Sequence, residues 1–141
     1  MMLSCGVDVV ELIHFSRILE RGGEHFLKRV FTDQELSYCR ARVPQLAARF
    51  AAKEACTKAL GTGARGVTLR EIEVISDQRG KPSFRLSGRA AARAAEIEAT
   101  KWSLSLSHSE GMAVAFVVMT GGRLADEVSK DHSDEIITGD A

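Results

Sequence analysis

Two pairs of strand-like runs, each joined by a short turn, most strongly limit the folds open to this sequence. Residues 71–76 and 82–86 flank Asp-Gln-Arg-Gly at 77–80, which is typical of a hairpin turn. Residues 102–107 and 112–119 form a second pair around a turn that contains glycine. Strands joined by short turns pair antiparallel, whereas parallel strands need a longer crossover connection. We therefore expect a largely antiparallel sheet.

One long helix is marked at both of its ends. Pro44 suits the first turn of this helix, and Gly61 suits the position just past its last turn. A shorter helix precedes it, because Thr32 and Glu35 have the spacing of a capping box, which predicts a helix beginning at Asp33.

The remaining elements complete an α+β pattern. Residues 3–10 favour a strand, residues 12–29 a helix interrupted by two adjacent glycines, and residues 89–99 an alanine-rich helix. Residues 62–66 form a glycine-rich loop after the long helix. Helices interspersed with hairpins predict an α+β fold, in which the long helix and the shorter ones pack against the antiparallel sheet.

The last 21 residues differ from the rest in charge. Residues 121–141 carry two basic and six acidic side chains, a net charge of −4. The other 120 residues therefore hold 17 of the 19 basic and 13 of the 19 acidic side chains, a net charge of +4. Because the final segment is polar and lacks periodicity, we expect one domain at 1–120 and a disordered acidic tail at 121–141. The positive excess suits an acidic partner or a phosphate-rich ligand, and is too small to indicate nucleic acid.

Three features bear on the compartment. The longest apolar run, at 112–119, is too short to span a bilayer and predicts a buried strand. The first residues lack the basic region followed by an apolar stretch that marks a signal peptide. Cys5, Cys39 and Cys56 form no CxxC pair, which favours free thiols in a reducing cytosol. We expect a cytoplasmic protein that does not bind membranes.

Glu54 and Lys58 lie four residues apart on the long helix and share one of its faces. Their helical neighbours in projection are Ala47, Phe50 and Ala51, so the charged pair interrupts an otherwise apolar face. One interpretation is a plain surface ion pair, which contributes about 0.3–0.5 kcal/mol. The other is a carboxylate and an ammonium held beside a ligand, with the alanines leaving room for it.

Asp8 lies between Val7 and Val9 inside the first strand-like run. A carboxylate is costly to bury there unless it is paired or binds a metal. Asp8 and Glu54 together would supply two hard oxygen ligands, and Mg²⁺ completes such a set with waters and substrate phosphate oxygens. The alternative is a residue at the strand end that caps the following helix near Glu11.

Serine and leucine alternate over residues 103–107, which predicts a strand with one polar face. His108 follows this strand, between Ser107 and Ser109. Such a histidine could bind phosphate or transfer a proton, or it could be an ordinary turn residue. The sequence contains no GxSxG elbow, which argues against a serine hydrolase.

Taken together, these segments resemble the holo-acyl-carrier-protein synthase family of 4′-phosphopantetheinyl transferases. The similarity covers about residues 3–120, in order and spacing. Its motifs are Gly-Val-Asp-Val-Val-Glu at 6–11, Phe-Thr at 31–32, Glu-Leu at 35–36, Arg-Phe-Ala-Ala-Lys-Glu-Ala at 49–55, Lys-Ala-Leu-Gly-Thr-Gly at 58–63, Gly-Lys-Pro at 80–82 and Ser-Leu-Ser-His-Ser at 105–109.

The resemblance implies a role for each matching position. Asp8 and Glu54 match the metal ligands of the family, and Lys58 matches the lysine beside the reacting phosphate. His108, with Ser107, matches the Ser-His position near the coenzyme. Gly61 and Gly63 belong to the loop that approaches it. The implied reaction moves phosphopantetheine from coenzyme A to a serine of an apo acyl carrier protein, depends on Mg²⁺, and releases adenosine 3′,5′-bisphosphate.

The resemblance also implies an assembly. Small family members are homotrimers with active sites between subunits, and larger members duplicate the domain in one chain. The length of this chain, and Val10 in place of the third acidic ligand common in larger members, suit the small type. His14 stands where a basic residue is common, and the acidic tail lies outside the family pattern.

The acyl carrier proteins that this family modifies resemble one another in being acidic, so we expect a basic docking surface on this chain. Arg17 and Arg21 form an i,i+4 pair on the first helix, with Lys28 further along, and they could equally be solvated surface residues.

Two other functions stay open, namely another Mg²⁺-dependent phosphoryl or nucleotidyl transferase and a non-catalytic module that binds coenzyme A or a nucleotide. Nothing in the sequence says whether the carrier serves fatty-acid, polyketide or peptide synthesis.

Overall fold

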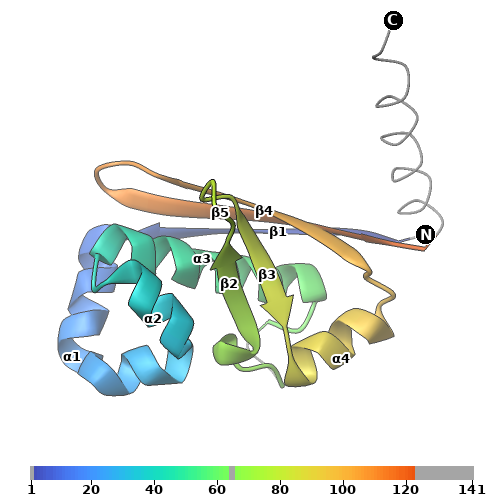
Figure 1. Ribbon diagram of the computed structural model, residues 1–141, viewed down its shortest axis with the longest axis horizontal. Coiled ribbons are helices and arrows are strands. Elements are labelled where there is room, and N and C mark those ends of the chain that lie inside the picture. The colour runs from blue at the N-terminus through green and yellow to red at the C-terminus, as the bar shows by residue number, and fades with distance from the viewer. Residues whose placement is uncertain (1, 64–65, 123–141) are drawn as a thin grey trace, which may run out of the picture.

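The computed structural model of the chain describes residues 2–63 and 66–122. Its elements, in chain order, are β1 (Met2–Glu11), α1 (Leu12–Val30), α2 (Asp33–Cys39), α3 (Val43–Leu60), the 3-10 turn η1 (Leu69–Glu71), β2 (Ile72–Ser76), β3 (Pro82–Leu86), α4 (Gly88–Glu96), β4 (Lys101–His108) and β5 (Met112–Gly121). A three-stranded sheet has the order β1-β5-β4, β2 pairs with β3, and every pairing is antiparallel. The expected α+β fold is confirmed, and Figure 1 shows the helices on one side of the three-stranded sheet.

Small side chains allow α3 to lie close against the sheet. Ala113 and Ala115 of β5 are fully buried, as are Ala51 and Ala55 of α3. The helix ends as expected, since Pro44 lies in its first turn and Gly61 caps its C-terminus in the left-handed conformation at φ 74°. The backbone of α3 therefore runs directly beneath β1 and β5.

A buried ion pair joins α2 and α3. Glu35 completes the predicted capping box with Thr32 at the N-terminus of α2. The carboxylate of Glu35 lies 2.6 Å from Lys53 Nζ, and both side chains are fully buried. Lys53 also donates to the carbonyl oxygens of Leu69 and Ile72, so all three of its N–H groups have partners. The pair is costly to break from one side, because removing either partner leaves a buried charge uncompensated.

The other interruptions predicted from the sequence are also present. Gly23 breaks α1 with φ 54° and ψ −143°, conformational space that residues with a Cβ rarely enter. Residues 77–80 form the turn of the β2–β3 hairpin, in which Asp77 Oδ1 accepts from the backbone N–H groups of Arg79 and Lys81. Trp102 Nε1 donates to the Phe84 carbonyl oxygen, which ties this hairpin to β4.

One face of the three-stranded sheet is apolar and exposed. On β1, Leu3, Val7 and Val9 are 67%, 49% and 53% exposed, and on β5 the outward side chains include Met112 and Phe116. The expectation that residues 112–119 form a strand is confirmed, but the expectation of full burial is wrong for a single chain. Alternate side chains of β5 point away from α3, where no element of residues 2–63 and 66–122 covers them.

Strand β5 runs one residue past the expected domain boundary at residue 120. Gly121 is still the last residue of β5 and pairs with Met2. The rest of the acidic segment, from residue 123, lies outside the described residues. Within the described ranges, no helix combines the length and apolarity needed to cross a membrane.

Candidate active site

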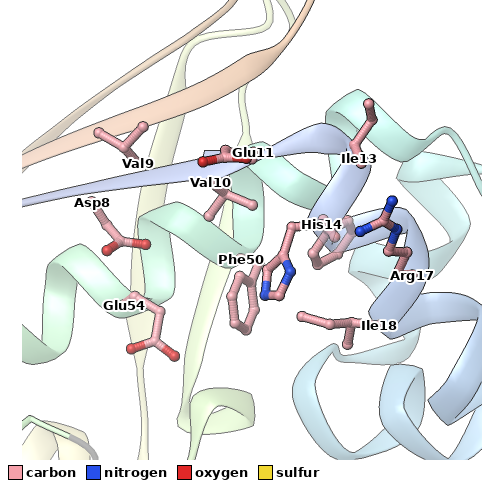
Figure 2. A pocket seen from close by; sticks show the side chains of 11 residues that line it. Asp8, Val9, Val10, Glu11, Ile13, His14, Arg17, Ile18, Phe50 and Glu54 are labelled. Atoms are coloured by element: carbon pink, nitrogen blue, oxygen red, sulfur yellow. The ribbon is translucent and has the colours of Figure 1, made fainter.

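Asp8 and Glu54 come from different elements and face the same space. Asp8 lies on the α3-facing side of β1, where it is opposite Ala115 of β5. Glu54 lies on α3 and lines the same cleft as Asp8. Figure 2 shows both carboxylates directed into one region at the end of a cleft between β1, α1 and α3.

Lys58 pairs with Asp8 and not with Glu54. Its Nζ lies 3.2 Å from Asp8 Oδ1 and donates to the Val7 carbonyl oxygen at 2.9 Å. Among residues 2–63 and 66–122, no ion pair joins Glu54 to Lys58, so the interpretation as a plain i,i+4 pair is wrong. The capping interpretation of Asp8 is also wrong, because Glu11 is the N-cap of α1 and makes no side-chain cap hydrogen bond.

The Glu54 carboxylate is half-buried, and the described part of the chain supplies it with no hydrogen bond or ion pair. Burial raises the pKa of Glu54, and repulsion by the Asp8 carboxylate raises it further, while Lys58 acts in the opposite direction. Such a group gains most from a cation placed between the two carboxylates.

The two carboxylates suit a magnesium ion. Both are hard oxygen ligands, and Mg²⁺ is commonly held by one or two carboxylates together with waters and substrate phosphates. Over the described ranges, no group of three or more His, Cys, Asp or Glu side chains could hold a metal. Two carboxylates suit an ion that takes few protein ligands, whereas a closed structural metal site usually has four.

Two clefts meet at Phe50 and Glu54. The larger, of about 650 Å³, runs from Asp8 along α1 past Ile13, His14 and Arg17. The second, of about 460 Å³, lies between Arg29 of α1 and the segment 67–69. An elongated ligand bound at Glu54 can therefore extend in two directions.

His108 lies on the other side of α3. It ends β4, at the opposite edge of the sheet from β1, and lines a third cleft of about 210 Å³ with Tyr38 and Arg49. On α3, Arg49 and Glu54 lie on opposite faces, because five residues turn the helix by about 500°. One chain therefore does not bring His108 together with Asp8 and Glu54. Ser107 precedes His108 with its side chain exposed on the other face of β4.

Arg49 was quoted in the family motif but was not predicted to be a site residue. Only 6% of this arginine is exposed, and its guanidinium stacks over the Tyr38 ring at 4.4 Å. It donates long hydrogen bonds to the Gln45 carbonyl oxygen and to Ser76 Oγ. Across the described residues, no carboxylate pairs with it. The buried guanidinium lines the same cleft as His108. Its position opposite Glu54 on the helix is the sequence signal that could have indicated a second binding face.

The predicted glycines lie just past Lys58. Gly61 caps α3, and the N–H groups of Thr62 and Gly63 donate to the Thr57 carbonyl oxygen. Gly61 and Gly63 both have positive φ, so the chain turns sharply here. The loop passes through residues 64–65, which lie outside the described residues.

The predicted docking residues are exposed on α1. Arg17 borders the larger cleft with Ile13 and His14, as Figure 2 shows. Arg21 follows one turn later. Lys28 lies beyond the break at Gly23 and lines a separate depression. The structure therefore joins Arg17 to the candidate site and separates Lys28 from it.

Comparison with known proteins shows the family to which the chain belongs. The family model of the 4′-phosphopantetheinyl transferase superfamily matches residues 4–117. Proteins named holo-[acyl-carrier-protein] synthase from Herpetosiphon aurantiacus and Trichlorobacter lovleyi are 47% and 49% identical to this chain, and their matches cover 85% and 84% of it and 100% and 98% of their own lengths.

Solved structures extend the similarity to the fold. The Helicobacter pylori holo-[acyl-carrier-protein] synthase in complex with coenzyme A is 28% identical, with a TM-score of 0.76, and the match covers 82% of this chain and 99% of that one. The enzyme of Neisseria meningitidis is 39% identical, with a TM-score of 0.77 and coverage of 83% and 97%.

The chain therefore belongs to the 4′-phosphopantetheinyl transferase superfamily. Within that superfamily it is an enzyme of the holo-[acyl-carrier-protein] synthase type. The resemblance found in the sequence motifs is confirmed.

Proposed function

We propose that this enzyme transfers 4′-phosphopantetheine from coenzyme A to a serine of an apo acyl carrier protein, in a Mg²⁺-dependent reaction that releases adenosine 3′,5′-bisphosphate. The observation that carries the proposal is the convergence of the Asp8 and Glu54 carboxylates beside Lys58, at the junction of two clefts. The Helicobacter pylori relative of known structure is in complex with coenzyme A.

Asp8 and Glu54 would hold Mg²⁺ in this reaction. When bound, the ion supplies Lewis-acid stabilisation to the pyrophosphate oxygens of coenzyme A. Glu54 has no ion-pair partner among residues 2–63 and 66–122, which leaves its carboxylate available as a ligand. Asp8 is held by Lys58 and points toward the same space as Glu54 (Figure 2).

Lys58 is placed to meet the reacting phosphate. Its ammonium is about half exposed and lies at the edge of the carboxylate pair. As the serine oxygen forms its bond to phosphorus and the bond to the leaving bisphosphate breaks, negative charge grows on the phosphate oxygens, and Lys58 offsets it. The hydroxyl proton passes to a water that Glu54 can orient.

The phosphate-rich end of the coenzyme needs a second set of cations. Arg49 supplies a cation beside His108, but both residues lie on the opposite face of α3 from Glu54. A neighbouring subunit can bring its own Arg49, Ser107 and His108 to the Asp8 cleft. The exposed apolar face of β1 and β5 supports such an assembly, and we propose a homotrimer with this face buried between subunits.

Arg17 and Arg21 are proposed to dock the acidic carrier protein. Both are exposed, and Arg17 borders the cleft that leads to Asp8, so a carrier bound on α1 could extend its serine along this cleft. Lys28 is further away and would steer the encounter only through its charge.

The free thiols of Cys5, Cys39 and Cys56 suit the reducing cytosol in which we place the enzyme.

A mass measurement tests the reaction. The enzyme is incubated with coenzyme A, Mg²⁺ and an apo acyl carrier protein, and the carrier is weighed. A gain of one phosphopantetheine, abolished in Asp8→Ala, supports the proposal. Coenzyme binding without a mass gain on carriers from fatty-acid, polyketide and peptide synthesis would support the non-catalytic module. Breakdown of the coenzyme without carrier modification would support a different phosphoryl or nucleotidyl transferase.

A further inference from the structure

The chain is in unusually close contact where β1 crosses α3. A Cβ atom added to Gly6 would lie 1.9 Å from the Ala55 carbonyl oxygen and 2.9 Å from the Ala59 backbone nitrogen. Gly6 has no positive φ, so its backbone conformation does not require glycine. The requirement is space, because a strand interior glycine allows another backbone to approach closely.

This contact lies between the residues of the candidate site. Gly6 and Asp8 alternate onto the same face of β1, and Ala55 directly follows Glu54 on α3. The second contacted residue, Ala59, directly follows Lys58. The point of closest approach is thus within two residues of every charged group in the site.

A second tie holds the same crossing together. The Ser4 hydroxyl donates to the Ala59 carbonyl oxygen from the same face of β1 as Gly6. Because Gly6 has no side chain and Ser4 bonds to Ala59, β1 is held close to α3 at this point. We infer that Gly6 is a positioning residue, which sets the separation of the Asp8 and Glu54 carboxylates by letting β1 lie directly on α3.

The inference has a specific consequence for metal choice. A methyl group at position 6 needs roughly 3.5 Å from the Ala55 oxygen, so β1 must move by roughly 1.5 Å and carry Asp8 with it. Mg²⁺ demands near-ideal octahedral geometry at about 2.0–2.1 Å, whereas Ca²⁺ accepts longer and more variable distances of about 2.3–2.6 Å. Gly6→Ala should therefore weaken Mg²⁺ more than Ca²⁺.

The inference rests on the proposed function, because it assumes that Asp8 and Glu54 bind a metal. The experiment titrates the full-length protein with Mn²⁺ in the presence of coenzyme A, follows free Mn²⁺ by electron paramagnetic resonance, and then displaces it with Mg²⁺ or Ca²⁺. Asp8→Asn defines the signal that comes from the coenzyme alone.

Gly121→Ala is the matched control. A Cβ at Gly121 would lie 1.7 Å from the Glu98 carbonyl oxygen, an equally severe clash. Gly121 belongs to the same sheet but pairs with Met2, far along the strand from the Asp8 position. Both variants should lose thermal stability, and only Gly6→Ala should lose Mn²⁺ affinity, by about tenfold or more, and shift its preference toward Ca²⁺.

A milder variant covers the case in which Gly6→Ala does not fold. Ser4→Ala removes the second tie without adding an atom and should weaken Mg²⁺ a few-fold relative to Ca²⁺. Equal metal affinity and selectivity in wild type and the folded variants would overturn the role of Gly6 while leaving the proposed function intact. If wild type and Asp8→Asn gave the same titration, the metal assignment would fall, and this inference with it.

Discussion

Lys58 reaches from α3 to Asp8 on β1, with Nζ 3.2 Å from Oδ1, and no cation of residues 2–63 and 66–122 forms an ion pair with Glu54. The pair therefore links β1 to α3 through two residues that are 50 positions apart in the chain. Its consequence is a site that holds one bridged carboxylate and one unpaired carboxylate. The ionised form of Glu54 is disfavoured both by burial and by the nearby Asp8 carboxylate, and its pKa is raised.

Replacing Glu54 with a neutral residue should raise the stability of the metal-free protein at neutral pH. Because the folded pKa of Glu54 lies above its ordinary value, the folded protein binds more protons than the unfolded chain between those two values, and stability falls as pH rises through this window. In metal-free buffer, Glu54→Gln should therefore unfold at a higher temperature than wild type at neutral pH, with the difference vanishing in acid. Calorimetry across pH measures this. A variant less stable than wild type at pH 7 would contradict it.

Removing either proposed metal ligand should abolish transfer. Asp8→Ala and Glu54→Gln should each lower the Mg²⁺-dependent rate by about 100-fold or more, since changing even a residue behind a metal ligand costs about 10–100-fold. Carrier mass at several Mg²⁺ concentrations gives the rate, and circular dichroism shows whether the fold is kept. Near-normal rates at limiting Mg²⁺ in either variant would refute the site.

The apolar outer face of the sheet should determine the assembly. Light scattering should give three times the 15.3 kDa mass of the chain. Phe116→Asp places a charge on a side chain that is 45% exposed in the single chain, and it should dissociate the assembly and stop transfer. Ser83→Asp, on an exposed position of β3, is the control. A wild-type monomer at working concentration would remove the basis for a shared site.

Charge reversal on α1 should affect the carrier alone. Arg17→Glu with Arg21→Glu should raise the KM for the carrier and flatten its salt dependence, because such charges steer encounter and are screened by salt. The KM for coenzyme A should barely change. The same double reversal at the exposed Arg79 and Arg89 should leave both KM values near wild type. Weakened coenzyme binding, or no effect at low salt, would show that α1 is not the docking surface.

Arg49 should recognise a phosphate of the coenzyme. Arg49→Gln should raise the KM for coenzyme A several-fold and have less effect with 3′-dephospho-coenzyme A, because the buried guanidinium has no other anion among the described residues. Arg42→Gln is the matched control, since Arg42 also lies by the Tyr38 ring, at 5.9 Å, but is exposed. Equal losses for the two coenzymes would indicate a structural role for Arg49.

Much of the fold follows from local signals in the sequence. The capping box of Thr32 and Glu35, the break at Gly23 and the stop at Gly61 all act within a few residues, so spacing alone locates them. The α+β class and the antiparallel hairpins follow from the same short-range patterns. Asp8, Glu54 and Lys58 could be predicted as a group because their motifs match a family in order and spacing.

Long-range contacts had to be read from the tertiary structure. No local pattern indicates that Lys58 pairs with Asp8 and not with Glu54, because that choice depends on how closely β1 lies on α3. The burial of Arg49 depends likewise on Tyr38 and on the β2–β3 hairpin.

The sequence by itself determined which segments become the main helices and strands, where a cap or a glycine ends them, and which residue types the family chemistry requires. It did not locate every end, since the helix expected at 89–99 is α4, Gly88–Glu96. Only the tertiary structure decided that Arg49 and His108 face one side of α3 while Asp8 and Glu54 face the other, and that one face of β1 and β5 stays apolar and exposed. The physical reason is range. Helix caps and turns are satisfied within a few residues. The packing of β1 on α3 instead joins residues about 50 positions apart, such as Gly6 and Ala55 or Asp8 and Lys58, and that packing sets the distance between charges.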